Sequence, residues 1–343
     1  MTTSELDLLS AAKRGDENAF GRLVAPYRCE LRAHAYRMLG SVADAEDALQ
    51  DALLGAWGGL DRFEGRSSLR SWLYTITTNA ALKTIRKRPR RLLPIDFCPP
   101  ADPNEPHQPP LVESTWIEPI PDHLIFAADE AAGPEAQYEQ REGVELAFIA
   151  ALQYLPPRQR AVLILRDVLD FSAREAAEML ETTPVSIDSA LQRAHKTIRE
   201  RLPDRAREAA APRPLLDAEM RRIVDEYTKA FEAADVPALA GMLADECALS
   251  MPPLREWYSG REAVAAYYGK LGLDERPRRL LPTRANALPA AAHYSWDARQ
   301  GIFVPHAIHA IGVRDGKIQA ITVFTMPAAF ARFGLPKRLE PEP

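Results

Sequence analysis

The sequence predicts a multidomain protein in which two all-α helical domains are followed by an α+β domain. Apolar residues recur at three- and four-residue intervals through residues 5–91 and again through 135–206, which is typical of helices. A stretch holding ten prolines separates these two blocks. Strand-like alternation begins only after about residue 240, and helices followed by strands within one block indicate an α+β arrangement. A length of 343 residues suffices for two or three separate cores.

The first block, residues 5–91, is predicted to be helical throughout. Its stretch AFGRLVAPYRCELRAHAYRML carries an apolar stripe made of Phe20, Leu23, Val24, Tyr27 and Leu31. Ser41 is placed to cap a second helix, SVADAEDALQDALLGAW, whose first turns are acidic, as a helix N-terminus favours. A third helix is expected in SLRSWLYTITTNAALKTIRKR, because its apolar spacing outweighs the β-branched run TITT.

Residues 92–134 are predicted to form a proline-rich acidic linker. Proline removes a backbone donor and disfavours helix at the preceding residue, so an extended conformation is expected. Within this stretch, LVESTWIEPIPDHLI is apolar enough to dock on a folded domain.

The second block, residues 135–206, is predicted to end in a helix-turn-helix. Ser172 and Glu175 are spaced as a capping box ahead of AAEML. Thr183 followed by Pro184 suits an N-cap and the first position of the next helix. The short turn between these two starts has the length that a helix-turn-helix requires.

The second helix of this pair has a buried side and an outward side. At about 100° per residue, Ile187, Leu191, Ala194 and Ile198 fall on one side. The residues that we predict to contact DNA lie opposite them or at the helix start: Val185, Ser186, Ser189, Gln192, Arg193 and Lys196. Gln suits adenine edges, whereas Arg suits guanine edges or phosphate. A solvated face of an ordinary helical bundle would also be polar. Asp188 lies on the flank, where it would repel phosphates.

The third block, residues 215–336, is predicted to be α+β. Helices in DAEMRRIVDEYTKAFEAAD and VPALAGMLAD precede strand-like runs such as CALSMP. In HAIHAIGVRDGKIQAITVF, Asp315-Gly316 lies between two alternating apolar runs, which predicts a β-hairpin.

Charge is distributed unevenly along a chain of net charge −5. From Arg62 to Arg91, nine basic residues face Glu64 alone, and such patches favour nucleic acid. The three cysteines are far apart in the sequence, which predicts reduced structural thiols rather than a disulfide framework or a zinc site. Because the sequence shows neither an apolar signal core nor a membrane-length apolar run, we expect a cytoplasmic protein.

Three stretches together resemble a known family. LPPRQRAVLILRDVLDFSAREAAEMLETTPVSIDSALQRAHKTIRERL resembles region 4 of a bacterial sigma factor of the extracytoplasmic-function (ECF) type, in the sigma-70 family. GSVADAEDALQDALLGAW resembles the core-binding helix of region 2, and FEGRSSLRSWLYTITTNAALKTIRKR resembles the promoter-melting segment. The matches span about residues 10–205 in the family's order, with a linker between them. Asp188 and Ala190 stand where many members carry Lys and Arg, so the resemblance implies no particular promoter sequence.

The resemblance implies a promoter-specificity subunit that binds core RNA polymerase and promoter DNA. Core-polymerase contact would involve Asp44, Glu46, Asp47, Gln50, Asp51 and Trp57. Promoter contact by the first block would involve Arg70, Trp72, Thr75, Asn79, Lys83, Arg86, Lys87 and Arg88. Extracting a base costs roughly a few kcal/mol, which stacking and backbone charge offset. The acids would also complement their helix dipole, and Trp72 would also suit a core position. No cofactor and no metal is implied.

The stretch YTKAFEAADVPALAGMLADECALSMPPLREWYSGREAVAAYY resembles a SnoaL-like domain of the nuclear transport factor two-like fold, in which a curved sheet surrounds a cone-shaped cavity. Candidate cavity residues are Trp257, Tyr258, Arg284, His293 and His306. His306 and His309, three apart in a strand-like run, should point to opposite faces and form a poor metal pair. We predict a regulatory role for this domain, through contact with the first block or the linker, and leave small-molecule binding open.

Two other function classes stay open at this point. A one-component regulator would bind DNA alone and sense a ligand through the third block, and a stable DNA complex without polymerase would favour it. A SnoaL-like isomerase or cyclase would need a cavity carboxylate or histidine that turnover requires. The order of the family resemblances favours the sigma factor, which is not an enzyme.

Overall fold

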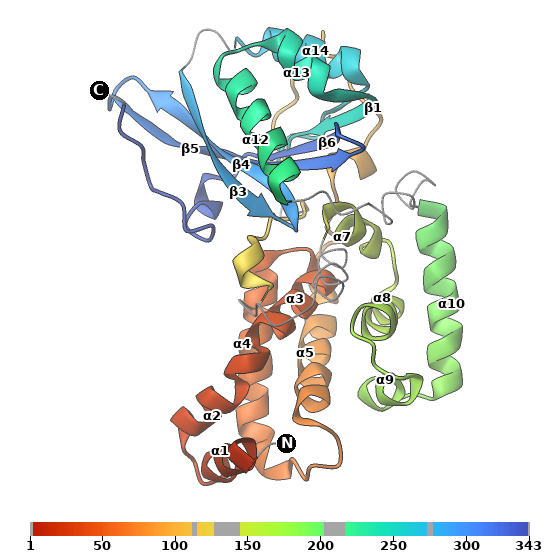
Figure 1. Ribbon diagram of the computed structural model, residues 1–343. Coiled ribbons are helices and arrows are strands. Elements are labelled where there is room, and N and C mark those ends of the chain that lie inside the picture. Colours follow the sequence, from red (N-terminus) through yellow and green to blue (C-terminus); the bar gives the residue numbers. More distant parts are fainter. Residues whose placement is uncertain (1–2, 112–114, 127–144, 202–216, 273–276, 342–343) are drawn as a thin grey trace. The chain divides into compact units, whose positions relative to one another are not determined.

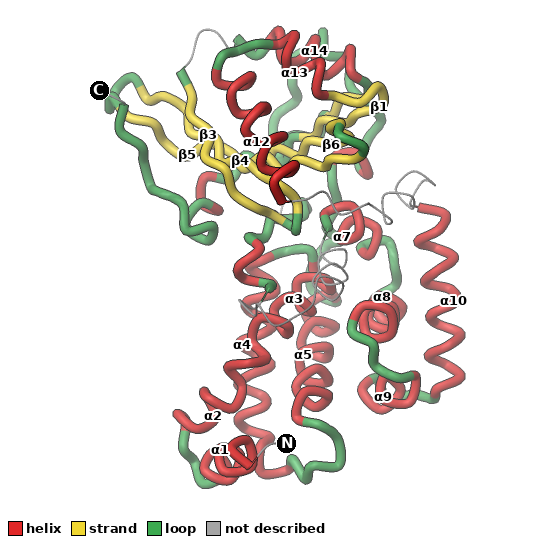
Figure 2. The backbone as a smooth tube through the Cα atoms, viewed as in Figure 1, coloured by secondary structure: helices red, strands yellow, loops and turns green. Residues whose placement is uncertain are grey.

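The computed structural model describes residues 3–111, 115–126, 145–201, 217–272 and 277–341 (Figure 1). The chain divides into two compact units. One comprises Met1–Arg91 and His123–Ala206, and the other comprises Leu92–Asp122 and Arg207–Pro343. Helices dominate the first unit, whereas the second combines helices with a six-stranded sheet (Figure 2). The predicted fold class, two helical blocks followed by an α+β domain, is therefore confirmed.

The first helical block consists of α1 (Thr3–Lys13), α2 (Glu17–Val24), α3 (Arg28–Leu39), α4 (Val42–Gly59) and α5 (Leu69–Ile85). Asp16, Ser41 and Ser68 cap α2, α4 and α5, each accepting a hydrogen bond from the N–H three residues further on. A 3₁₀ turn, Ala25–Tyr27, separates α2 from α3, with Pro26 in that turn. The predicted apolar stripe of the first stretch therefore falls on two helices instead of one.

The second helical block contains α7 (Leu146–Leu152), α8 (Pro157–Leu163), the π-helical turn η5 (Ile164–Val168), α9 (Ala173–Met179) and α10 (Pro184–Arg201). It packs on the first block through Phe171, whose ring lies edge-on to Tyr74 at 5.2 Å. Arg160 is buried and donates to the Met38 carbonyl at the end of α3. Residues 135–144 and 202–206 of this predicted domain lie outside the described residues.

The sheet of the second unit runs in the order β2-β1-β6-β5-β4-β3. Its strands are β1 (Leu243–Ser250), β2 (Trp257–Ser259), β3 (Arg278–Ala285), β4 (Leu288–Asp297), β5 (Ile302–Arg314) and β6 (Lys317–Phe324). Only the β1–β6 pair among these neighbours is parallel. Arg314 pairs with Lys317, and Asp315 and Gly316 between them have φ of 49° and 71°. Two positive φ angles match a type I′ turn, so the predicted hairpin is confirmed.

Helices α12 (Asp217–Glu232), α13 (Val236–Met242) and α14 (Arg261–Lys270) gather on one face of this sheet (Figure 1). Helix residues such as Tyr227, Phe231 and Tyr268 pack there in one apolar core with Leu249 and Ile311 of the strands. This arrangement of helices over a sheet is that of a SnoaL-like domain.

The predicted linker is not a free tether over its first part. Residues 92–122 belong to the second unit, and residues 127–134 lie outside the described residues. Pro121 forms a bridge with Ala285, and Asn286 donates to the Ile120 carbonyl at 2.9 Å. Trp116, Ile117 and Ile120 are buried. The expectation that this apolar stretch docks on a folded domain is thus confirmed, and burial of its large side chains accounts for the docking.

Candidate polymerase and promoter interfaces

One face of α5 carries four of the predicted promoter contacts. At about 100° per residue, Trp72, Thr75, Asn79 and Lys83 fall within an arc of about 80°. We call these four residues the α5 face. Asn79 and Lys83 are exposed, whereas Trp72 and Thr75 are half-buried. The Trp72 ring packs on Phe63 with 4.9 Å between ring centroids. Trp72 therefore contributes to packing and also remains partly accessible to solvent.

Arg70 is not on the α5 face. It lies about 180° from Asn79 around the helix and donates to Glu30 at 3.1 Å. Its guanidinium lies 4.9 Å from the ring centres of both Tyr74 and Phe171, a cation–π arrangement. The structure therefore places Arg70 at the junction of the two helical blocks and does not bring it together with the other predicted promoter contacts of α5.

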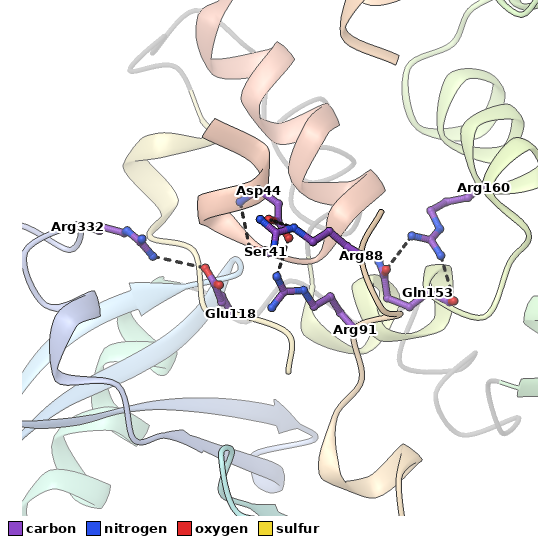
Figure 3. Close-up of polar contacts among 8 residues, drawn as sticks. All are labelled: Ser41, Asp44, Arg88, Arg91, Glu118, Gln153, Arg160 and Arg332. Carbon is purple, nitrogen blue, oxygen red and sulfur yellow. Dashed lines mark hydrogen bonds and ion pairs between the residues drawn. The ribbon is translucent and has the colours of Figure 1, made fainter. Parts of the chain in front are cut away.

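The basic tail, residues Arg86–Arg91, is partly bound by an acid of α4, as Figure 3 shows for Arg88 and Arg91. Arg86 and Lys87 are exposed at the end of α5. Arg88 and Arg91 both form ion pairs with Asp44, at 3.4 Å and 2.6 Å. Arg90 lies over the ring of Tyr154 at 4.4 Å. Only part of the predicted phosphate-contacting charge is thus directed to solvent.

The six predicted polymerase contacts differ in accessibility. Asp47, Gln50 and Asp51 are exposed along α4. Glu46 is half-buried and accepts from Arg32, and Trp57 packs on Phe20 at 5.1 Å. Asp44 is buried, because its carboxylate binds the two arginines of the basic tail. The prediction that Asp44 faces a partner does not fit this position, whereas the exposed residues keep that prediction.

A groove of about 460 Å³ runs between α2 and α4. Its lining residues are Glu17, Phe20, Gly21, Val24, Arg28, Glu46, Leu49, Gln50, Leu53, Leu54 and Trp57. Leu54 is 62% exposed and lies with Leu53 and Trp57 in this lining, so the groove presents apolar surface to solvent. Sequence reasoning named Gln50 and Trp57 but missed the apolar residues between them, although their spacing along α4 is readable.

The helix-turn-helix forms as its caps predict. Ser172 and Glu175 make both hydrogen bonds of a capping box. The Ser172 hydroxyl and the Ser172 N–H both donate to the Glu175 carboxylate, which lowers the pKa of that carboxyl. The Thr183 hydroxyl accepts from the Ser186 N–H at 3.2 Å at the start of α10. Ile187 and Ala194 are fully buried, whereas Leu191 and Ile198 are half-buried. Two of the four predicted buried positions are therefore only partly buried.

The opposite side of α10 carries the predicted DNA-contacting residues. Val185 is 75% exposed, and Ser186, Gln192, Arg193 and Lys196 are exposed as well, while Ser189 is half-buried. Asp188 is exposed on the flank of this surface. The structure brings these residues together on one helix, in a form that suits insertion into a major groove.

The five candidate cavity residues of the SnoaL-like domain do not form one cluster. Trp257 donates to the Cys98 carbonyl at 2.7 Å, and Arg284 pairs with Asp122 at 2.8 Å, so both hold the 92–122 segment. Tyr258 is buried and stacks on Tyr267 at 4.6 Å. Of the five, His293 and His306 lie beside each other, with 4.9 Å between ring centroids.

His306 and His309 do not diverge as strand alternation predicts. A register shift between β4 and β5 follows His293, and the rings of both His306 and His309 approach His293, at 4.9 and 5.3 Å. The bulge adds a residue and so cancels the alternation, a signal that the sequence does not show. His309 is buried, and its Nδ1 is hydrogen-bonded to the Tyr227 hydroxyl at 2.9 Å. Burial lowers the pKa of His309 to about 3. Within the described residues, no group of three His, Cys, Asp or Glu is arranged to hold a metal.

Comparison with known proteins agrees with this geometry. The Sigma-70 region 2 family model matches residues 23–91, and the Sigma-70 region 4 model matches residues 145–198. The chain is thus a sigma factor of bacterial RNA polymerase, and residues 23–91 and 145–198 are called region 2 and region 4 below. It is 39% identical to the ECF RNA polymerase sigma factor SigG of Mycobacterium tuberculosis over 334 residues, covering 95% of this chain and 86% of that protein. The chain belongs to the ECF family of RNA polymerase sigma factors.

Two further relatives define how far the similarity extends. The ECF sigma factor SigW of Bacillus subtilis is 26% identical and covers 57% of this chain and 95% of SigW. The crystal structure of the Mycobacterium tuberculosis ECF sigma factor SigJ covers 90% of this chain and 97% of its own, with a TM-score of 0.57 and 21% identity. The SigJ match thus extends the shared fold into the SnoaL-like unit. In the described part of the chain, no helix has the length and hydropathy needed to cross a bilayer.

Proposed function

We propose that this sigma factor binds core RNA polymerase through the α2–α4 groove and the exposed polar edge of α4. The observation that carries this proposal is the pairing of exposed Asp47, Gln50 and Asp51 with an apolar groove that holds a largely exposed Leu54. A partner helix that places apolar side chains in the groove and basic side chains along the edge would fit both features.

The promoter surfaces are proposed to be the α5 face with Arg86 and Lys87 in region 2, and the outward side of α10 in region 4. Support comes from the exposure of Asn79, Lys83 and Lys87 beside the half-buried Trp72, which supplies an aromatic ring for an unpaired base. Gln192 and Arg193 supply the donors and acceptors that base edges require.

The SnoaL-like domain is proposed to modulate initiation without catalysis, through the 92–122 segment that it holds. The domain holds this segment by specific polar contacts. Arg284 binds Asp122, and Asn286 binds the backbone of Ile120. Arg332 lies 3.4 Å from Glu118 (Figure 3). A conformational change in this domain would therefore move the segment that connects region 2 to region 4.

Reconstitution with core polymerase tests these proposals. The full chain should co-purify with core and support initiation from its own promoter, located by mapping transcript starts after induced expression. Leu54→Asp should abolish co-purification, whereas Leu271→Asp, the same change at an exposed leucine of the other unit, should not. Specific DNA binding without polymerase would instead favour a one-component regulator.

The regulatory proposal has its own test. Arg284→Ala removes the ion pair to Asp122, and we expect transcription to change at matched protein level. Arg299→Ala, at an exposed position in the turn between β4 and β5, serves as control. Unchanged transcription by Arg284→Ala, with the 92–122 segment shown by protease sensitivity to be released, would sink the proposal.

A further inference from the structure

The carboxylate of Asp44 lies beside two arginines of the basic tail (Figure 3). Its side chain is 7% exposed, against 45% for Glu46. One oxygen accepts from Arg91 Nη2 at 2.6 Å, and the other lies 3.4 Å from Arg88 Nε. The carboxylate therefore binds two guanidinium groups of the basic tail, both of which follow α5 in the chain.

The backbone around Asp44 is shaped to receive this tail. Gly40 has φ of +65°, and a Cβ there would lie 3.3 Å from both Arg91 Cβ and Gln153 Nε2. Ser41 caps α4 by accepting from the Asp44 N–H at 3.2 Å, which fixes the turn that presents the carboxylate. The corner between α3 and α4 thus leaves room for Arg91 where another residue would carry a side chain.

The tie divides the cations that end α5 into two groups. Arg91 is buried against Asp44, and Arg88 is paired with the same carboxylate although its side chain is 53% exposed, whereas the earlier Lys83, Arg86 and Lys87 are exposed at the end of α5. The tie fixes the chain directly after the helix end. Without it, the last turn of α5 would lose its anchor and fray, as unanchored helix ends do.

We propose that Asp44 is a positioning residue for promoter binding: by holding Arg88 and Arg91 it fixes the end of α5, so that Lys83, Arg86 and Lys87 meet DNA phosphates as a preformed row. Asp44 itself touches neither DNA nor polymerase. This inference rests on the proposed role of the α5 end as a DNA surface.

Charge and positioning predict opposite signs for the removal of this carboxylate. If Asp44 acted only as a negative charge near DNA, replacing it with Asn would remove repulsion and strengthen DNA binding. If Asp44 holds the cation row in place, the same change weakens binding although it raises the net charge. The direction of the effect therefore separates the two.

The experiment uses reconstituted holoenzyme and a promoter duplex, with affinity measured from 50 to 200 mM salt. Asp44→Asn should lower affinity and reduce the ratio of the affinities at 50 and 200 mM by about tenfold, the loss expected for about two phosphate contacts. Affinity for core polymerase should stay unchanged. Asp47→Asn removes the same charge from the exposed edge of the same helix and should change core affinity but not the salt slope.

Two further variants keep the test decisive. Arg91→Lys retains every charge but loses the planar fork that binds a carboxylate, so it should flatten the slope in the same direction as Asp44→Asn, by less. A salt slope is independent of the fraction of active protein, so partial unfolding cannot imitate it. Tighter DNA binding by Asp44→Asn, or an unchanged slope in both variants, overturns the positioning role. If Lys87→Gln also leaves the slope unchanged, the proposed DNA surface itself is wrong.

Discussion

Helices α5 and α10 are both proposed to contact promoter DNA, yet they differ in how much of each helix is buried in the core. Around α5, Leu73, Tyr74, Thr77 and Thr78 are all buried, and the helix is enclosed by α3, α4 and region 4. In α10, only Ile187 and Ala194 are fully buried among the described residues. A substitution in α5 therefore risks the core, whereas most positions of α10 are free to define sequence preference. The residues proposed to open the promoter thus lie on a helix that belongs to the core, whereas the residues proposed to read bases lie on a helix that is mostly exposed.

The largest expected effect comes from removing a buried aromatic ring of α5 itself. Tyr74 is fully buried, packs edge-on to His34 and Phe171, and donates to Glu30 at 3.1 Å. Tyr74→Ala should cost about 3–5 kcal/mol of unfolding free energy, the usual loss for a buried large aromatic ring. Chemical denaturation would measure it. Tyr74→Phe, which keeps the ring, should cost markedly less, and equal losses would contradict a packing role.

A pH effect on stability is expected at the α5 side of region 2, in addition to the one that buried His309 contributes in the SnoaL-like unit. His34 is buried against α5 and its Nε2 lies 2.8 Å from the Thr78 hydroxyl, and burial lowers its pKa to about 3. Because the folded pKa lies below the unfolded value of about 6.5, the stabilisation is present above pH 6.5 and declines as pH falls toward 3. From pH 6.5 to 5 the loss is about 2 kcal/mol. His34→Gln should flatten the pH dependence of unfolding, whereas a slope identical to wild type would argue against this histidine.

On α10 the expected effect is on binding and not on stability. Arg193 is exposed, so Arg193→Ala should leave the unfolding free energy within about 0.5 kcal/mol of wild type. Loss of its contact should weaken promoter binding by about tenfold and relax base preference at one position. Holoenzyme binding to a randomised promoter library would show both. A uniform loss across all sequences would make Arg193 a phosphate contact.

The smallest expected effect is on promoter affinity and concerns Asp188, on the flank of the outward side of α10. Asp188 is exposed beside the outward surface, and Asp188→Lys replaces repulsion of phosphate by attraction. Promoter affinity should rise severalfold, with a salt slope steeper by about 0.9. Glu181→Lys, exposed in the preceding turn, controls for net charge. If both variants leave affinity and salt dependence unchanged, Asp188 has no part in promoter binding.

Much of the helical architecture was predictable because its signals are local. The caps at Ser41, Ser172 and Thr183 mark helix starts that the structure reproduces within a residue. Even the position of Arg70 was accessible, since helical geometry alone sets it about 180° from Asn79. The family resemblance placed Arg70 and Asn79 in one promoter-contacting set, whereas helical periodicity puts them on opposite sides of α5.

Other features depend on contacts between distant residues and had no local signal. An acid in the first turn of a helix suits the helix dipole whether it is exposed or buried, so the tie between Asp44 and Arg91 was not readable. The bulge near His306 arises from pairing between β4 and β5, which strand alternation within one segment does not show. The docking of LVESTWIEPIPDHLI was foreseen from its apolar content, and contact of the third block with the linker was one of the two alternatives predicted, but the individual contacts were not.

The chain route through the two units has a topological consequence. Residues 92–122 are part of the SnoaL-like unit, while the residues before and after them belong to the helical unit, so the peptide chain passes between the units more than once. The SnoaL-like unit is therefore a discontinuous domain, built from an insertion within the sigma sequence and from the segment after Ala206. A single proteolytic cut just after Ala206 should leave both fragments associated under native conditions, because the inserted piece remains part of the cleaved domain's fold. Separation would require unfolding, not mere cleavage.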